Sequence, residues 1–143
     1  MNFSSVKKSL LLFICFSTIL SARTINYSLV IEHPEKHLAS IEMQIPTTGL
    51  DSITVALPAW APGRYVIYNF SKNLFDLQAA GPAGQILPTE LLDKQTWKIH
   101  CAGSDKITIR YSIFANTLDG TQSKIDSSGA SINGAGVFFV FDI

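Results

Sequence analysis

Three histidines and one cysteine have the residue types and spacing that chemistry would need. His33 and His37 stand four residues apart, and on a helix two histidines at this spacing share a face and bind zinc. Pro34 lies between them, and the alternating apolar residues on both sides predict strands joined by a turn. No acidic residue follows His33 directly, as the HExxH zinc signature requires. We therefore expect a solvated turn and no metal site here.

A second candidate is the neighbouring pair His100 and Cys101, because a histidine beside a cysteine can activate a nucleophile. Adjacent residues of a strand point to opposite faces, so we do not expect a catalytic pair. The sequence has no GxSxG elbow, phosphate-binding glycine loop or dinucleotide fingerprint. Nothing in the spacing of the aspartates pairs them in space. We predict no catalytic residue and no metal ligand in this chain.

Composition limits the classes of protein that these residues can build. The chain has 143 residues, of which 47% are hydrophobic and 15% charged, and its 11 basic and 11 acidic residues balance. This length fits one globular domain, and the apolar, turn-rich composition excludes a coiled coil or a disordered chain. Without a basic excess, neither nucleic acid nor an anionic membrane surface is an expected partner.

The first 22 residues have the pattern of a secretory signal peptide. Lys7 and Lys8 precede the apolar stretch 10–20, and the small residues Ser21 and Ala22 follow it. Eleven residues at about 1.5 Å each cover roughly half of a bilayer core, so a permanent membrane helix is not expected. We predict an exported protein, periplasmic or secreted, with no membrane attachment after cleavage. The mature domain, residues 23–143, then keeps Cys101 alone and forms no internal disulfide.

Most of the mature chain alternates apolar and polar residues with a period of two, which indicates strands. Turns rich in Gly, Pro, Asp and Ser recur about every ten residues, which favours an all-β, antiparallel β-sandwich. The first two strands are expected to form a hairpin. The predicted strands are 25–31, 41–45, 53–57, 65–70, 74–79, 86–92, 96–100 and 106–115.

The end of the chain departs from this pattern. Residues 116–136 are polar and rich in small residues, so we expect a loop there, followed by a buried strand at 137–141. Two explanations for that late apolar strand stay open. Either further chain follows and packs against it, or the strand closes the sandwich.

The stretch 57–65 is irregular because of its prolines. Pro58 and Pro62 stiffen the bend, and Gly63 permits a positive φ. Trp60 and Tyr65 offer large rigid apolar surfaces beside this turn. We expect Trp60 to fill a core or an interface; the alternative is an exposed platform on which a sugar or peptide stacks. Arg64 reaches either a carboxylate of a neighbouring domain or water.

The same stretch, Leu57-Pro58-Ala59-Trp60-Ala61-Pro62-Gly63-Arg64-Tyr65, resembles the N-terminal domain of glycyl-aminopeptidase-type zinc metallopeptidases, metallopeptidase family 61. That family tends to have Leu-Pro-x-Trp-x-Pro-Gly-x-Tyr at this point. Arg64 departs from the small residue that the family often has. Further similarities follow in the same order: Pro34 and His37 in the first turn, Asp93-Lys94-x-Thr96-Trp97 before a strand, and Asn133-Gly134 before the last apolar strand.

The resemblance implies a β-sandwich that precedes a thermolysin-like catalytic domain in an exported aminopeptidase. The family's zinc ligands lie in that catalytic domain, and this sequence has none of them, so zinc is expected only downstream. We therefore expect a non-catalytic N-terminal domain, truncated before its partner, which packs against the catalytic domain and borders its cleft. Besides the motif residues, the interface candidates are Arg64, Phe138, Phe139 and Phe141.

Two other functions are weighed against this one. A free-standing secreted module that binds peptides or glycans would use Trp60 and Tyr65 as contact residues. A small independent hydrolase would need a nucleophile and a base, and the sequence offers no such pair.

Overall fold

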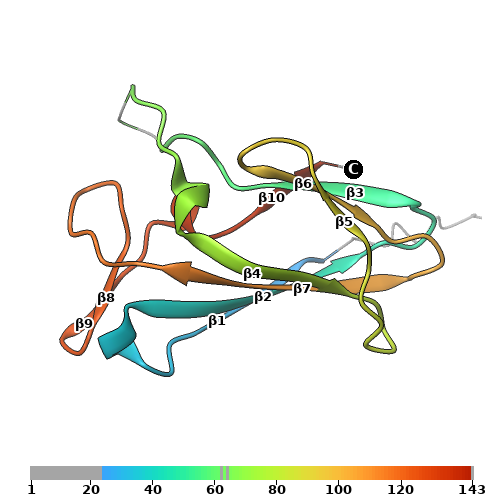
Figure 1. Cartoon of the computed structure of the whole chain (residues 1–143), viewed down its shortest axis with the longest axis horizontal. Coiled ribbons are helices and arrows are strands. Elements are labelled where there is room, and N and C mark those ends of the chain that lie inside the picture. The colour runs from blue at the N-terminus through green and yellow to red at the C-terminus, as the bar shows by residue number, and fades with distance from the viewer. Residues whose placement is uncertain (1–23, 62, 64, 143) are drawn as a thin grey trace, which may run out of the picture.

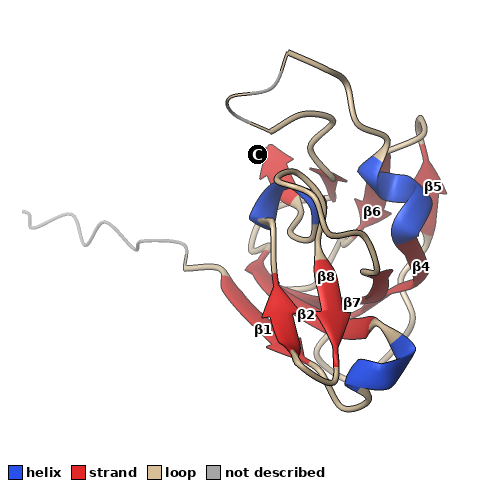
Figure 2. Cartoon of the chain, turned by 90° about the vertical axis from the view of Figure 1, so that its left-hand side faces the viewer, coloured by secondary structure: helices blue, strands red, loops and turns tan. Residues whose placement is uncertain are grey.

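The computed structural model describes residues 24–61, 63 and 65–142; the predicted signal peptide, residues 1–22, lies outside them. In this part of the chain, ten strands form two four-stranded antiparallel sheets and one two-stranded ribbon. The two larger sheets face each other across the core (Figures 1 and 2). The prediction of an all-β antiparallel sandwich is confirmed.

One sheet is built around the two longest strands and has the order β1-β2-β7-β4. Its members are β1 (Asn26–Val30), β2 (Leu38–Pro46), β7 (Lys106–Phe114) and β4 (Leu74–Ala80). The 3-10 turn η1 (Pro34–Lys36) joins β1 to β2, as the predicted hairpin requires. Alternate residues of β2 and β7 are buried, because a strand turns every second side chain to the same face.

The other sheet has the order β10-β3-β6-β5 and covers the first (Figure 1). It contains β10 (Val140–Asp142), β3 (Ser52–Ala56), β6 (Thr96–His100) and β5 (Thr89–Leu91). Ile53, Val55 and Ile99 are buried on its inner face. These aliphatic side chains belong to one core cluster with Ile41 and Ile109 of the facing sheet. Burial of this apolar surface is what holds the two sheets together.

One predicted strand is absent, and two others are much shorter than expected. Residues 65–70 do not pair as a strand; they form a loop that leads into the 3-10 turn η2 (Phe70–Asn73). In 86–92 only β5 forms a strand, and Pro88, which has no N–H to donate, directly precedes it. In 137–141 only the end pairs, because the N–H of Phe138 donates to the carbonyl of Gly134 and holds a turn there.

The polar stretch 116–136 is more ordered than predicted. It contains the hairpin of β8 (Lys124–Asp126) and β9 (Gly129–Ser131), and then the 3-10 turn η3 (Gly134–Gly136). The Asp126 carboxylate accepts the backbone N–H of Ser128 and pairs with Lys124 at 2.7 Å, which stabilises the hairpin turn. These local bonds, rather than apolar alternation, determine the conformation, so periodicity did not reveal the hairpin.

Two tyrosines hold the segment that runs between the sheets into β10. Tyr27 Oη donates to the carbonyl of Phe139 at 2.8 Å, and Tyr111 Oη donates to the carbonyl of Val137 at 2.9 Å. Burial raises the pKa of the Tyr111 hydroxyl well above its ordinary value, since a buried phenolate lacks solvation. The segment is therefore fastened to the first sheet from β1 and β7, the two strands that flank β2.

This buried hydroxyl predicts a loss of stability at alkaline pH. An unfolded chain releases the tyrosine proton near pH 10, whereas the folded chain retains it. The contribution of this hydroxyl to the free energy of unfolding is therefore fully present below pH 10 and decreases above it. One retained proton corresponds to a slope of about 1.4 kcal/mol per pH unit. Urea unfolding between pH 7 and 11 should show this decline, with a shallower slope for Tyr111→Phe. Equal slopes in both proteins would contradict the prediction.

Candidate functional site

The proline-rich motif lies in an irregular connection between β3 and η2, which we call the motif loop, residues 57–69. It projects from the left-hand end of the sandwich in Figure 1. The N–H of Tyr68 donates to the carbonyl of Ala59 at 2.6 Å and closes the loop at its base. Gly63 has φ of +85°, so the expected positive φ is confirmed. Pro62 and Arg64 lie outside the described residues.

The base of the motif loop is fixed by aromatic packing. The rings of Tyr68 and Phe70 stack with centroids 5.3 Å apart, and Phe70 is buried. Phe70 in turn lies against Gly136, where an added Cβ would come within 3.1 Å of the Phe70 ring. A side chain at position 136 would therefore push Phe70 away from the loop base. This close approach gives a physical reason for a glycine at this position.

Asn133 connects the same region by hydrogen bonds. Its side-chain oxygen accepts the N–H of Ala135 at 3.1 Å, and its amide NH₂ donates to the carbonyl of Thr121. Its backbone N–H donates to Ser123 Oγ at 2.9 Å. The Thr121 hydroxyl shares a 3.2 Å hydrogen bond with Tyr68 Oη. Asn133 thus links η3, the 115–124 connection and the motif loop, a role that the sequence pattern did not reveal.

Above this fixed base, the motif loop exposes large apolar side chains. Trp60 is 60% exposed, Ile67 82% and Tyr65 fully, and Val66 lies between them in the chain. Pro58 is only partly buried. Trp60 is therefore not a core residue of this domain, which leaves an interface or an exposed platform. Exposed apolar groups gathered on one loop mark a surface that contacts another molecule or domain.

The phenylalanines near the end of the chain lie mainly inside the domain. Phe139 is 1% exposed and packs on Trp97 and Tyr111, with ring centroids 5.2 and 4.6 Å apart. Its prediction as an interface residue is corrected: it is a core residue, because its ring lies between the two sheets. Phe138 and Phe141 are partly buried and pack against this core. The exposed apolar side chain of β10 is Val140.

The described histidines and the cysteine do not form a metal or nucleophile site. His37 bonds through Nδ1 to the carbonyl of Ile125, and His33 lies 3.3 Å from the exposed Glu35. Among the described residues, no group of three His, Cys, Asp or Glu side chains is arranged to hold a metal ion. Cys101 is buried and His100 is exposed, as opposite faces require. Burial, and then the Asp51 carboxylate, raise the pKa of the Cys101 thiol, which disfavours a reactive thiolate.

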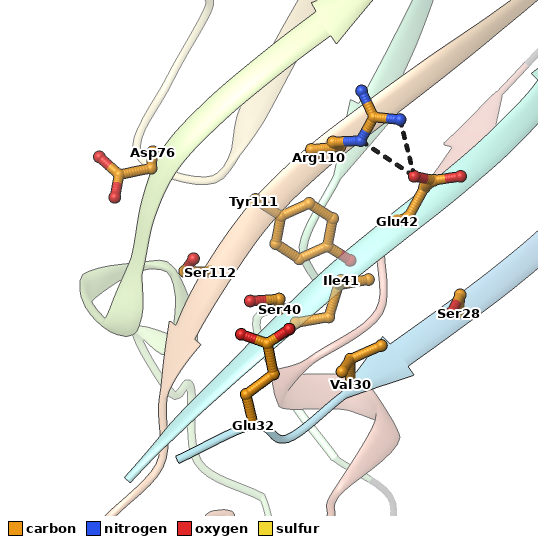
Figure 3. Close-up of a pocket in the computed structure, with 10 residues that line it drawn as sticks. All are labelled: Ser28, Val30, Glu32, Ser40, Ile41, Glu42, Asp76, Arg110, Tyr111 and Ser112. Atoms are coloured by element: carbon orange, nitrogen blue, oxygen red, sulfur yellow. Dashed lines mark hydrogen bonds and ion pairs between the residues drawn. The ribbon is translucent and has the colours of Figure 1, made fainter. Parts of the chain in front are cut away.

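A shallow hollow of about 320 Å³ lies on the outer face of the first sheet (Figure 3). It forms where three strands carry small side chains: Ser40 is paired with Ser112, and Ser28 lies diagonally from Ser40, paired with Glu42. Its rim carries the ion pair of Arg110 and Glu42, at 2.8 Å. Hydrogen bonds from Gln44 and from Arg110 lower the pKa of Glu42. The described residues that line the hollow include serine hydroxyls and carboxylates but no histidine.

In the part of the chain that the structure describes, no helix has the length and apolar character needed to span a bilayer.

These features define a class of protein: an all-β sandwich domain whose most distinctive surface is an apolar loop with a fixed base. The family model of the peptidase M61 N-terminal domain matches residues 26–142, so the chain belongs to this family. The resemblance found in the motif is thereby confirmed over nearly the whole described chain.

Comparison with solved structures agrees with this fold. An aminopeptidase N family protein from Idiomarina loihiensis superimposes with a TM-score of 0.74 at 24% sequence identity. The match covers 83% of this chain and 20% of that protein, so this chain spans about a fifth of its length. At this identity the similarity shows the fold alone. No curated protein matches the sequence.

Proposed function

We propose that this chain is the non-catalytic N-terminal domain of an exported zinc aminopeptidase, where it packs against the catalytic domain and borders its cleft. The observation that carries the proposal is the motif loop, whose base is fixed while Trp60, Tyr65 and Ile67 remain exposed. A loop held in this way loses little conformational entropy when it docks. Membership of a peptidase N-terminal domain family supports a peptidase catalytic domain as the partner.

We propose that zinc is not bound by this domain. The His37 ring bonds to the carbonyl of Ile125, and His33 lies beside Glu35. Among the residues that the structure describes, no three His, Cys, Asp or Glu side chains gather as a metal would require. We propose that the metal is held by an HExxH segment downstream of residue 143. The reading frame after residue 143 should encode that segment. A stop codon there, with no separate gene for such a domain, would overturn the proposal.

The docking role predicts the behaviour of a loop variant. Tyr65→Ser combined with Ile67→Ser should change the stability of the 143-residue chain by less than about 0.5 kcal/mol, because both side chains are exposed. In the longer polypeptide that includes the catalytic domain, the same change should weaken docking by at least about 100-fold, since burying each side chain contributes about 1.5–3 kcal/mol. Calorimetry should then show two separate unfolding transitions instead of one coupled transition.

A matched control is Ile86→Ser. Ile86 is 68% exposed and forms a bridge with Ala80, at the end of β4 farthest from η2. It should leave the calorimetric transitions coupled. If the loop variant also leaves them coupled, the motif loop does not dock.

The exposure of Trp60 also favours testing the second function, a free-standing binding module. Fluorescence titration of the 143-residue chain with peptides and glycans separates the two functions. A saturable change in Trp60 emission would support the module, whereas an interface tryptophan should respond to neither ligand. Trp97→Phe removes the other tryptophan of the chain, so the signal then comes from Trp60 alone.

A further inference from the structure

A row of mostly apolar side chains, with one threonine, crosses the outer face of the second sheet beside the motif loop. Val140 is paired with Ala56, and Ala56 with Thr96, in the sheet register. The N–H of Leu92 donates to the carbonyl of Thr96 at 2.9 Å and extends the same row to β5. Paired residues share a face, and the next residue of β3, Val55, is buried, so this row faces outward. We call these four residues the outer row.

The outer row exposes apolar surface at both of its ends. Val140 is 54% exposed and Leu92 49%, while Ala56 and Thr96 between them are partly buried. Four strands at about 4.8 Å spacing make the row roughly 14 Å wide. The neighbouring row on the same outer face, one step farther from the motif loop, contains Thr54, Lys98 and Glu90. The apolar strip therefore ends at a polar border, which is the arrangement of an interface centre and its rim.

The outer row and the motif loop lie next to each other. β3 ends at Ala56, and the motif loop begins with the next residue. The N–H of Leu57 donates to the carbonyl of Gln95 at 2.9 Å, which fastens the start of the loop to the turn that follows Leu92. Figure 1 shows the loop and this turn at the same end of the second sheet. The outer row and the motif loop thus adjoin each other at Ala56 and Leu57.

The motif loop alone offers less area than a typical specific interface. Trp60 and Tyr65 supply at most about 150–250 Å² each, or roughly 300–500 Å² together, and Val66 and Ile67 add smaller areas. A standard interface buries about 800 Å² on each partner. A docking partner that covers the loop must therefore also cover neighbouring surface, and the outer row is the apolar surface that adjoins the loop.

We infer that the outer row is the second half of the docking surface, and that its occupant is the catalytic domain of the same polypeptide. This inference rests on the proposed function. It adds which face of the sandwich the catalytic domain covers. This is the outer face of β10, β3, β6 and β5, from the end nearest the motif loop as far as Lys98 and Glu90. Because Val140 belongs to β10, a domain joined to that strand starts beside the outer row.

Cysteine labelling tests the inference in the protein as it exists. Single variants Ile67→Cys, Leu92→Cys, Val140→Cys and Ile86→Cys are made in the 143-residue chain and in the longer polypeptide. Each is reacted with a maleimide, and the labelled site is quantified by peptide mass spectrometry. Native Cys101 is fully buried and serves as the internal unreactive reference. Because the variant positions are exposed or half-exposed, the 143-residue chain should tolerate the substitutions.

We expect the cysteines at positions 67, 92 and 140 to react at least about tenfold more slowly in the longer polypeptide than in the 143-residue chain. The cysteine at position 86 should react at the same rate in both. Protection of position 67 without protection of 92 and 140 would overturn this inference and leave the proposed function standing. Unchanged rates at all four positions would overturn both. Protection of 92 and 140 that grows with the concentration of the 143-residue chain would assign the outer row to a second copy, and so overturn the inference.

Discussion

Replacing Phe139 with alanine is expected to lower the free energy of unfolding by about 3–5 kcal/mol, the cost of removing a buried aromatic side chain and leaving a cavity. Phe139 is 1% exposed and lies against Trp97 of one sheet and Tyr111 of the other. Its loss would remove contacts on both sides of the core at once. A domain of this size has a total stability of only about 5–15 kcal/mol, so much of the chain would unfold at moderate temperature.

Urea unfolding of wild type and variant measures this effect directly. The control is Phe114→Ala, because Phe114 is 43% exposed on the outer face of β7 and contacts His37 at its edge. That substitution should cost about 1 kcal/mol or less. Phe139→Leu, which keeps most of the volume, should fall between the two. Equal losses for Phe139→Ala and Phe114→Ala would mean that Phe139 is not a core residue.

Asn133→Ala is the second large effect that we expect. The change removes the acceptor for the Ala135 N–H and the donor to the Thr121 carbonyl. Leaving partly buried backbone groups unpaired costs about 1–3 kcal/mol for each group, so the total should be roughly 2–6 kcal/mol. Because Thr121 also bonds to Tyr68, the base of the motif loop should loosen. Amide hydrogen exchange at Tyr68, whose N–H closes the loop, should then accelerate.

A control separates the two bonds. Asn133→Asp keeps the acceptor for the Ala135 N–H but has no donor for the Thr121 carbonyl, so it should lose roughly half of the stability that alanine loses. Exchange at Ile109, in the centre of β7, reports on global unfolding and corrects for it. If exchange at Tyr68 accelerates no more than exchange at Ile109, Asn133 does not anchor the loop.

Much of the sandwich was predictable from the alternation of side chains. In 38–46 and 106–114 every second residue is buried, because successive side chains of a strand point to opposite faces and only one face of these strands is covered. The prediction failed where local bonds replaced that rule. Tyr65, Val66 and Ile67 are apolar enough for a strand, yet they lie in the motif loop, which the N–H of Tyr68 closes through its bond to Ala59.

The candidate site was predictable only in part. The prolines, Gly63 and the aromatic residues of the motif identified the loop, because these residue types restrict or permit particular backbone angles. The anchor at Asn133 lies 65 positions from Tyr68, and the two are linked through Thr121. Such contacts join residues that are far apart in the chain, so no local sequence pattern predicts them.

The sequence by itself determined the all-β class, the place of the motif loop and the family, because alternation, turn residues and the motif are local properties of the chain. Only the tertiary structure decided which apolar residues are buried and which remain exposed. Phe139 and Ile67 are both large and apolar, but a facing sheet covers one and nothing in the described chain covers the other. Burial depends on what the fold brings opposite a side chain, and that is set by strand order and register.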